Sequence, residues 1–171
     1  GSGLVGSEMC IRDRYVMWFH LELKGMGYGA AQSGVAISDK VTGPYKFIRA
    51  GRINSGKWAM NITEEMKTME MPENSGPYPG SSLPMHPDSL NVHKRDFEGG
   101  QMARDMNLFV DDDGKAYHIY ASEENSTLHI AQLTDDYTDH NGTYIRCFVG
   151  RFMEAPAMFK HEGKYYLMMS G

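Results

Sequence analysis

A hairpin signal that occurs twice is the feature of this sequence that most constrains its fold. Residues 106–117 and 157–166 each place apolar and aromatic residues on both sides of an acidic residue and a glycine, Asp113-Gly114 and Glu162-Gly163, about fifty residues apart. Such a pair supplies the positive φ angles of a tight turn, so each segment predicts an antiparallel hairpin. Repetition at this period predicts a propeller, a solenoid or another repeat array rather than one ordinary domain.

Further strand patterns repeat in the same order. Residues 15–20 form a short aromatic and β-branched run, followed by an apolar run at residues 33–38 and a Thr-Gly-Pro turn. The same order of strand, turn, strand and turn recurs over residues 117–137. Runs of this kind between turn residues are typical of buried strands. The sequence therefore predicts an all-β chain that contains two copies of one antiparallel unit.

The first residues need separate treatment, because residues 4–14 resemble the in-frame translation of a sequencing adapter. We therefore expect residues 1–14 to be a non-native leader and residues 15–171 to be the natural segment, a fragment of a longer gene. An unusual but genuine N-terminus is the alternative. Residues 1–14 are left out of the fold prediction.

Composition narrows the class of protein. The chain has 171 residues, 41% of them hydrophobic and 23% charged, which is ordinary for a soluble globular chain. It has no run of eighteen apolar residues, so no membrane-spanning helix is predicted. The net charge of −5, without a stripe of basic residues, argues against a nucleic-acid partner. Because Cys10 lies in the suspect leader, we expect Cys147 to be an unpaired buried thiol.

Residues 52–100 separate the two copies and carry several prolines without a sustained period of 2 or 3.6. We expect a long insertion between two blades, with at most one short helix over residues 61–69, capped by Asn61 and closed by Glu64. This insertion either walls a pocket or forms a solvated surface excursion.

Two acidic residues stand just ahead of the predicted hairpin strands. Asp105 follows Arg104, whose positive charge would favour the ionised carboxylate, whereas Glu154 has apolar neighbours that would favour its protonated form. Carboxylates at equivalent points of successive blades would converge on a central axis. Hydrolysis of a glycosidic bond needs one protonated and one ionised carboxyl group. The alternative is a structural role, as strand caps or in a salt bridge with Arg104.

A family resemblance rests on residues 103–125, 154–159 and 163–167, with the segments Arg-Asp-Met and Glu-Ala-Pro. These residues resemble glycoside hydrolase family 43, and within it the galactan-directed branches of exo-β-1,3-galactanases and β-galactofuranosidase-like enzymes. The resemblance implies an incomplete five-bladed β-propeller with about three blades present, and an inverting mechanism. It implies Glu154 as the general acid and Asp105 as the residue that tunes its acidity and orients the sugar.

The same resemblance implies substrate-binding roles for His20, Tyr28, Arg104 and Asn125. A lone histidine at a strand end is more often a structural hydrogen bonder, so both readings of His20 stay open. The catalytic base of the family would lie outside these residues. We therefore expect the isolated polypeptide to be inactive.

Metal ligands are not apparent. The acidic turn at residues 111–113 lacks the ligand register of a calcium loop, and His86 and His93 lack the paired spacing of a zinc site. We expect no cofactor, although the family leaves room for a structural calcium ion in a full-length propeller. The expected partner is an oligosaccharide or polysaccharide, with no membrane, and the full-length protein is expected to be a monomer outside the cell or in the periplasm. A non-catalytic carbohydrate-binding or scaffold propeller is the alternative function.

Overall fold

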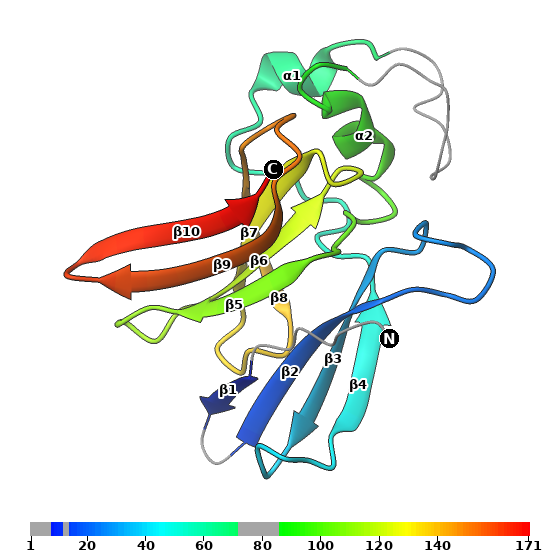
Figure 1. Cartoon of the computed structure of the whole chain (residues 1–171). Coiled ribbons are helices and arrows are strands. Elements are labelled where there is room, and N and C mark those ends of the chain that lie inside the picture. Colours follow the sequence, from blue (N-terminus) through cyan, green and yellow to red (C-terminus); the bar gives the residue numbers. More distant parts are fainter. Residues whose placement is uncertain (1–7, 12–13, 72–85) are drawn as a thin grey trace.

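The computed structural model describes residues 8–11, 14–71 and 86–171, and for residues 8–11 it describes the backbone alone. Three antiparallel sheets make up most of this described part (Figure 1). One sheet has the order β1 (Glu8–Ile11), β2 (Arg14–Leu21), β3 (Gln32–Ser38), β4 (Lys46–Gly51), and another has the order β5 (Met106–Val110), β6 (Ala116–Ser122), β7 (Thr127–Leu133), β8 (His140–Cys147). The third pairs β9 (Glu154–His161) with β10 (Lys164–Ser170).

The repeated unit predicted from the sequence is confirmed. Strands β2, β3 and β4 form consecutive antiparallel pairs, and β6, β7 and β8 do the same in the next sheet. Strand β5 lies between the other two sheets and contacts both β2 and β9 (Figure 1). The all-β prediction therefore holds, while the number of blades in a complete ring stays a prediction.

The core lies between the two four-stranded sheets. Trp18 of β2 is 1% exposed and is therefore a core residue. Its ring packs against His118 and His140 at centroid distances of 5.1 and 4.9 Å, and its indole N–H donates to the carbonyl of Tyr137 at 2.9 Å. Because an aromatic side chain of this size buries a large apolar area, Trp18 holds the two sheets together.

The two predicted turns differ in detail. Glu162 and Gly163 both have positive φ and join β9 to β10 through a two-residue turn, as predicted. At the other turn only Gly114 has positive φ, and the β5–β6 pairing ends at Val110 and Ala116. The connection there is thus a five-residue loop, in which the amide of Asp111 donates to the carbonyl of Lys115 at 2.9 Å. The hairpin is present as predicted, but Asp113 lacks the positive φ that the sequence assigned to it.

The segment between β4 and β5 corrects the helix prediction. Its described residues form two helices, α1 (Glu64–Thr68) and α2 (Leu90–Arg95), where at most one was expected. The cap of α1 is Thr63, whose hydroxyl accepts from the amide of Met66, rather than Asn61. The amide group of Asn61 instead bonds the backbone N–H and carbonyl of Arg146 in β8 at 3.0 and 2.8 Å. A tertiary contact thus uses the side chain that local spacing assigned to the cap.

No helix in the described part of the chain is long and apolar enough to cross a membrane. Cys147 is a free, half-buried thiol, and burial raises its pKa. The side chain of Cys10 lies outside the described residues.

Candidate functional site

A pocket of about 330 Å³ lies where β2 ends and where β5 and β9 begin. Each of the three sheets therefore supplies part of its wall. The lining residues are His20, Arg104, Asp105, Met106, Asn107, Ala155, Pro156 and Ala157. The starts of β5 and β9 meet at this place, as the repeated acidic residues predicted. The described residues of the segment 52–100 do not line this pocket, which argues against their forming its wall.

Asp105 is an exposed residue at the mouth of the pocket, and it holds the backbone next to Glu154. Its Oδ2 accepts a hydrogen bond from the amide of Ala155 at 3.2 Å. Ala155 has a φ of 47°, a left-handed conformation that costs a residue with a side chain about 1–2 kcal/mol. Because Ala155 directly follows Glu154, the Asp105 contact fixes the peptide from which the Glu154 side chain projects.

Glu154 is half-buried at the first position of β9. Its Oε1 accepts a hydrogen bond from the side-chain amide of Asn125 at 2.7 Å. Glu154 adjoins the pocket through Ala155 but is not itself one of the lining residues. The start of β9 is thus held in two ways: Asp105 bonds the backbone of Ala155, and Asn125 bonds the side chain of Glu154.

Arg104 differs from its predicted role beside Asp105. Its guanidinium is 4% exposed and forms its ion pair with Glu124 at 3.1 Å. It also donates to the side-chain oxygen of Asn125 at 3.1 Å and to the carbonyl of Tyr28 at 3.0 Å. Arg104 is buried, whereas Asp105 is exposed at a bend ahead of β5, so the two side chains lie in different surroundings. Arg104 holds the Glu124–Asn125 turn.

His20 and Tyr28 lie at the other end of this network. The His20 ring lines the pocket and bonds the Glu22 carboxylate at 2.8 Å. Glu22 in turn accepts from the amides of Ala30 and Ala31 at 2.9 and 3.1 Å. The Tyr28 side chain is 62% exposed, and only its carbonyl takes part in the network. His20 thus has a structural partner and also faces the pocket.

Sequence reasoning missed Glu22 and Glu124, which hold the two loops of the site. Glu124 belongs to the Glu-Glu-Asn turn, in which Glu123, Glu124 and Asn125 all adopt positive φ. Consecutive left-handed residues that are not glycine are costly and persist only where their surroundings impose them. Glu22 carries no comparable sequence signal, since its partners are backbone amides eight and nine residues away.

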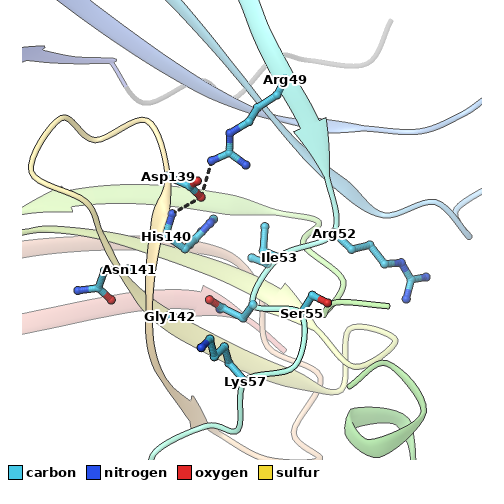
Figure 2. Close-up of a pocket in the computed structure, with 10 residues that line it drawn as sticks. Arg49, Arg52, Ile53, Ser55, Lys57, Asp139, His140, Asn141 and Gly142 are labelled. Atoms are coloured by element: carbon cyan, nitrogen blue, oxygen red, sulfur yellow. Dashed lines mark hydrogen bonds and ion pairs between the residues drawn. The ribbon is translucent and has the colours of Figure 1, made fainter. Parts of the chain in front are cut away.

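A second pocket, of about 230 Å³, lies on the side of β4 and β8 (Figure 2). It is lined by Arg49, Arg52, Ile53, Asn54, Ser55, Lys57, Asp139, His140, Asn141 and Gly142. Arg49 pairs with Asp139 at 2.5 Å across the pocket, and this ion pair joins the two four-stranded sheets. Arg52 points away in Figure 2, toward the carbonyls of Gly29 and Ala30. This pocket contains none of the predicted site residues.

One group of side chains in the described residues has metal-ligand character. His93, Glu123 and His129 are buried, with ligand atoms within 4.8 Å of one another. Local spacing around His93 could not reveal this group, because its partners come from distant strands. Arg146, however, donates to both oxygens of Glu123 at 2.6 and 2.7 Å. A metal ion here would stand beside a fixed positive charge, so this donor set does not fit one unless Arg146 is displaced.

Comparison with known proteins connects these residues to a family. The model for glycosyl hydrolases family 43 matches residues 86–171. A search of curated proteins found no match. Among solved structures, the chain is 49% identical to a family 43 β-1,3-galactosidase solved with galactodeoxynojirimycin, with a TM-score of 0.83, over 93% of this chain and 46% of that one.

Two further structures are similar. An exo-β-1,3-galactanase from Clostridium thermocellum is 32% identical over 97% of this chain and 29% of its own length, with a TM-score of 0.67. An exo-β-1,3-galactanase from Phanerochaete chrysosporium solved with galactose is 26% identical over 92% of this chain and 26% of its own, with a TM-score of 0.60. The chain thus spans half or less of the length of these proteins. The family match over half of the chain and the 49% identity to a family 43 enzyme over 93% of it show that the chain belongs to glycosyl hydrolases family 43.

Proposed function

We propose that this chain is part of a longer inverting glycosidase that releases galactose-type residues, or arabinofuranose, from plant or microbial polysaccharide. The observation that carries the proposal is the linked group of side chains around the pocket. Asp105 accepts from the backbone of Ala155 at the start of β9, and Asn125 and Arg104 connect Glu154 to the carbonyl of Tyr28. The named activities of the similar structures favour β-1,3-linked galactan as the substrate.

In this proposal Glu154 is the general acid. Its Oε1 is held by Asn125, which leaves Oε2 to carry the proton that goes to the leaving oxygen of the glycosidic bond. Inverting enzymes pair such an acid with a carboxylate that activates water on the opposite face of the sugar. We assign that base to residues outside this chain, so the isolated polypeptide should not turn over substrate.

The exposure of the remaining residues separates those that can contact a sugar from the one that positions other side chains. Asp105 is exposed at the mouth and keeps a second oxygen free for a sugar hydroxyl, besides fixing Ala155. His20 and the ring of Tyr28 are open enough to contact a sugar directly, with exposed side-chain fractions of 25% and 62%. Arg104 is buried and acts through its contact with Asn125, so we reassign it from sugar binding to positioning.

The test is the stereochemistry of product release by the longer protein. Purified enzyme acts on β-1,3-galactan in an NMR tube, and the anomeric proton of newly released galactose is followed before mutarotation. We expect the α-anomer first, because inversion at a β-linked carbon yields α-galactose. Release of the β-anomer first would contradict inversion. Binding of galactan without release would instead support the non-catalytic carbohydrate-binding propeller.

A further inference from the structure

A buried cluster of charged side chains adjoins the turn that carries Glu124 and Asn125. Its centre is Glu123, whose side chain is fully buried. Arg146 donates to both carboxylate oxygens, at 2.6 and 2.7 Å, and His129 contacts Oε1 at 2.8 Å. The hydroxyl of Ser89 donates to Oε2. The carboxylate of Glu123 is therefore surrounded by partners from three parts of the chain.

The cluster joins the segment before α2 to the second four-stranded sheet. Ser89 also bonds the hydroxyl of Thr127 in β7 at 2.7 Å, and Arg146 of β8 donates to the carbonyl of Asp88 at 2.7 Å. His93 of α2 lies 3.3 Å from Glu123. These contacts tie residues 88–93 to the sheet that carries the turn. The segment between β4 and β5 is therefore bonded to residues that support the site.

Successive side chains of this turn bind different partners. Glu123 points down into the cluster, while Glu124 pairs with Arg104 and Arg95, at 3.1 and 2.8 Å. Asn125 follows, and it bonds Glu154. The carbonyl of Glu123 also accepts from the amide of Ser126 at 3.2 Å. With three successive left-handed residues, a shift of Glu123 moves Asn125 as well.

The negative charge of Glu123 strengthens its contacts with Arg146 and His129. Burial opposes its ionisation, but the hydrogen bonds from Arg146 and His129, together with the nearby His93 ring, outweigh burial and hold the pKa of Glu123 well below its ordinary value. Removing one partner of a buried ion pair leaves the other charge uncompensated, which is strongly unfavourable. The carboxylate therefore stays ionised and in place.

We propose that Glu123 is a positioning residue that sets the place of Asn125, and through it of Glu154, by anchoring the turn to residues 88–93 and to Arg146. The catalytic consequence rests on the proposed function, but the positioning itself does not. Under this proposal the segment between β4 and β5 is part of the support of the site, although its described residues do not line the pocket.

The test uses the chain itself and nuclear magnetic resonance. The side-chain amide protons of Asn125 and the backbone amide of Ala155 are assigned in the parent, in Glu123→Gln and in the control Leu133→Ala. Leu133 is a buried residue at the far end of β7 from the turn, so its loss destabilises the sheet without touching the cluster. We expect Glu123→Gln to shift the Asn125 signals toward the values of a free amide, while Leu133→Ala lowers the melting temperature and leaves these signals in place.

Unchanged Asn125 signals in folded Glu123→Gln would overturn the proposal. Should that variant not fold, Ser89→Ala removes a single contact to Glu123, and a shift of the Asn125 signals is again expected, with unchanged signals again contradicting it. The readout needs no substrate. A longer protein without glycosidase activity would therefore refute the proposed function while leaving the positioning result intact.

Discussion

At the scale of residues, carboxylates hold strained backbone on two sides of the pocket. Glu22 accepts from the amide of Ala31 and Asp105 from that of Ala155, and both alanines have positive φ, 44° and 47°. Left-handed residues with a side chain cost roughly 1–3 kcal/mol each and tend to gather at functional sites. The acidic residues around this pocket thus shape loops as well as supplying chemistry, and that division could not be read from residue type alone.

A second residue-scale feature predicts how stability depends on pH. His118 is buried and His140 is half-buried, the two rings are bonded to each other at 3.0 Å, and desolvation lowers the pKa of His140 to about 4 from 6.5. The unfolded chain therefore binds more protons than the folded chain between these values, so stability falls as the pH falls from about 6.5 toward 4. At pH 5, His140 alone should cost about 2 kcal/mol relative to pH 7.5.

Urea denaturation at the two pH values measures this difference. His140→Gln should reduce it by about that amount, whereas His161→Gln should leave it unchanged, because His161 is exposed in the β9–β10 turn region. Equal stability of the parent at pH 5 and pH 7.5 would contradict the assignment of a neutral histidine pair.

At the scale of elements, local patterns predicted the strands better than the segment between them. The runs at residues 15–20, 33–38 and 117–122 fall within β2, β3 and β6 because alternation and turn residues are local signals. Helix α2 was missed because little in its sequence favours it locally. Its N-cap Ser89 makes no capping bond within the helix, and its burial against the sheet stabilises it instead. Tertiary contacts of this kind leave no hydrophobic periodicity in the local sequence.

The candidate site was predicted in part for the same reason. The hairpin pattern placed Asp105 and Glu154 just ahead of two strands, and the structure brings their surroundings together at one pocket. The contacts of Arg104 with Glu124 and Asn125 were not predicted, because these partners lie 20 and 21 residues away in the sequence. Glu123 was not predicted as a buried centre, since its partners Ser89 and Arg146 are far away in sequence.

The loop between β8 and β9 gives an element-scale prediction. Gly150 has a φ of +69°, and a Cβ there would lie 2.5 Å from the carbonyl oxygen of Pro87. Gly163 has a similar φ of +73° with nothing within 4 Å of a Cβ. Gly163→Ala should cost about 1–2 kcal/mol from the backbone conformation alone. Gly150→Ala should cost clearly more, because the loop must also move away from residues 86–88.

Thermal and urea denaturation of both variants measure the difference between them. Equal losses would mean that the backbone of Pro87 moves aside freely, and the close packing of this loop on the segment before α2 would then be wrong.

At the scale of the whole molecule, the β9–β10 sheet exposes a large apolar surface. Phe159 and Tyr166 stack at 5.1 Å and are 43% and 41% exposed, and Met168, two residues after Tyr166 in β10, is 59% exposed. Exposed apolar patches on a sheet with an unpaired edge promote association. We therefore expect the isolated chain to self-associate as its concentration rises in sedimentation velocity experiments.

A double variant, Tyr166→Lys with Met168→Lys, should sediment as a monomer. Phe47→Lys is the matched control, because Phe47 is 56% exposed on β4 in another sheet, and this variant should associate as the parent does. A parent chain that remains a monomer at every concentration would show that this surface is not adhesive.

Glu154 is the proposed proton donor of the glycosidase site. The most direct measurement is turnover of β-1,3-galactan by the longer protein that carries Glu154→Gln, with Glu162→Gln in the exposed β9–β10 turn as the matched control. General acid catalysis contributes about 10²–10⁴-fold, so Glu154→Gln should lower kcat by that factor while ligand binding is kept. The control should match the parent. Turnover by Glu154→Gln within a factor of about two of the parent, far below that range, would contradict the central assignment.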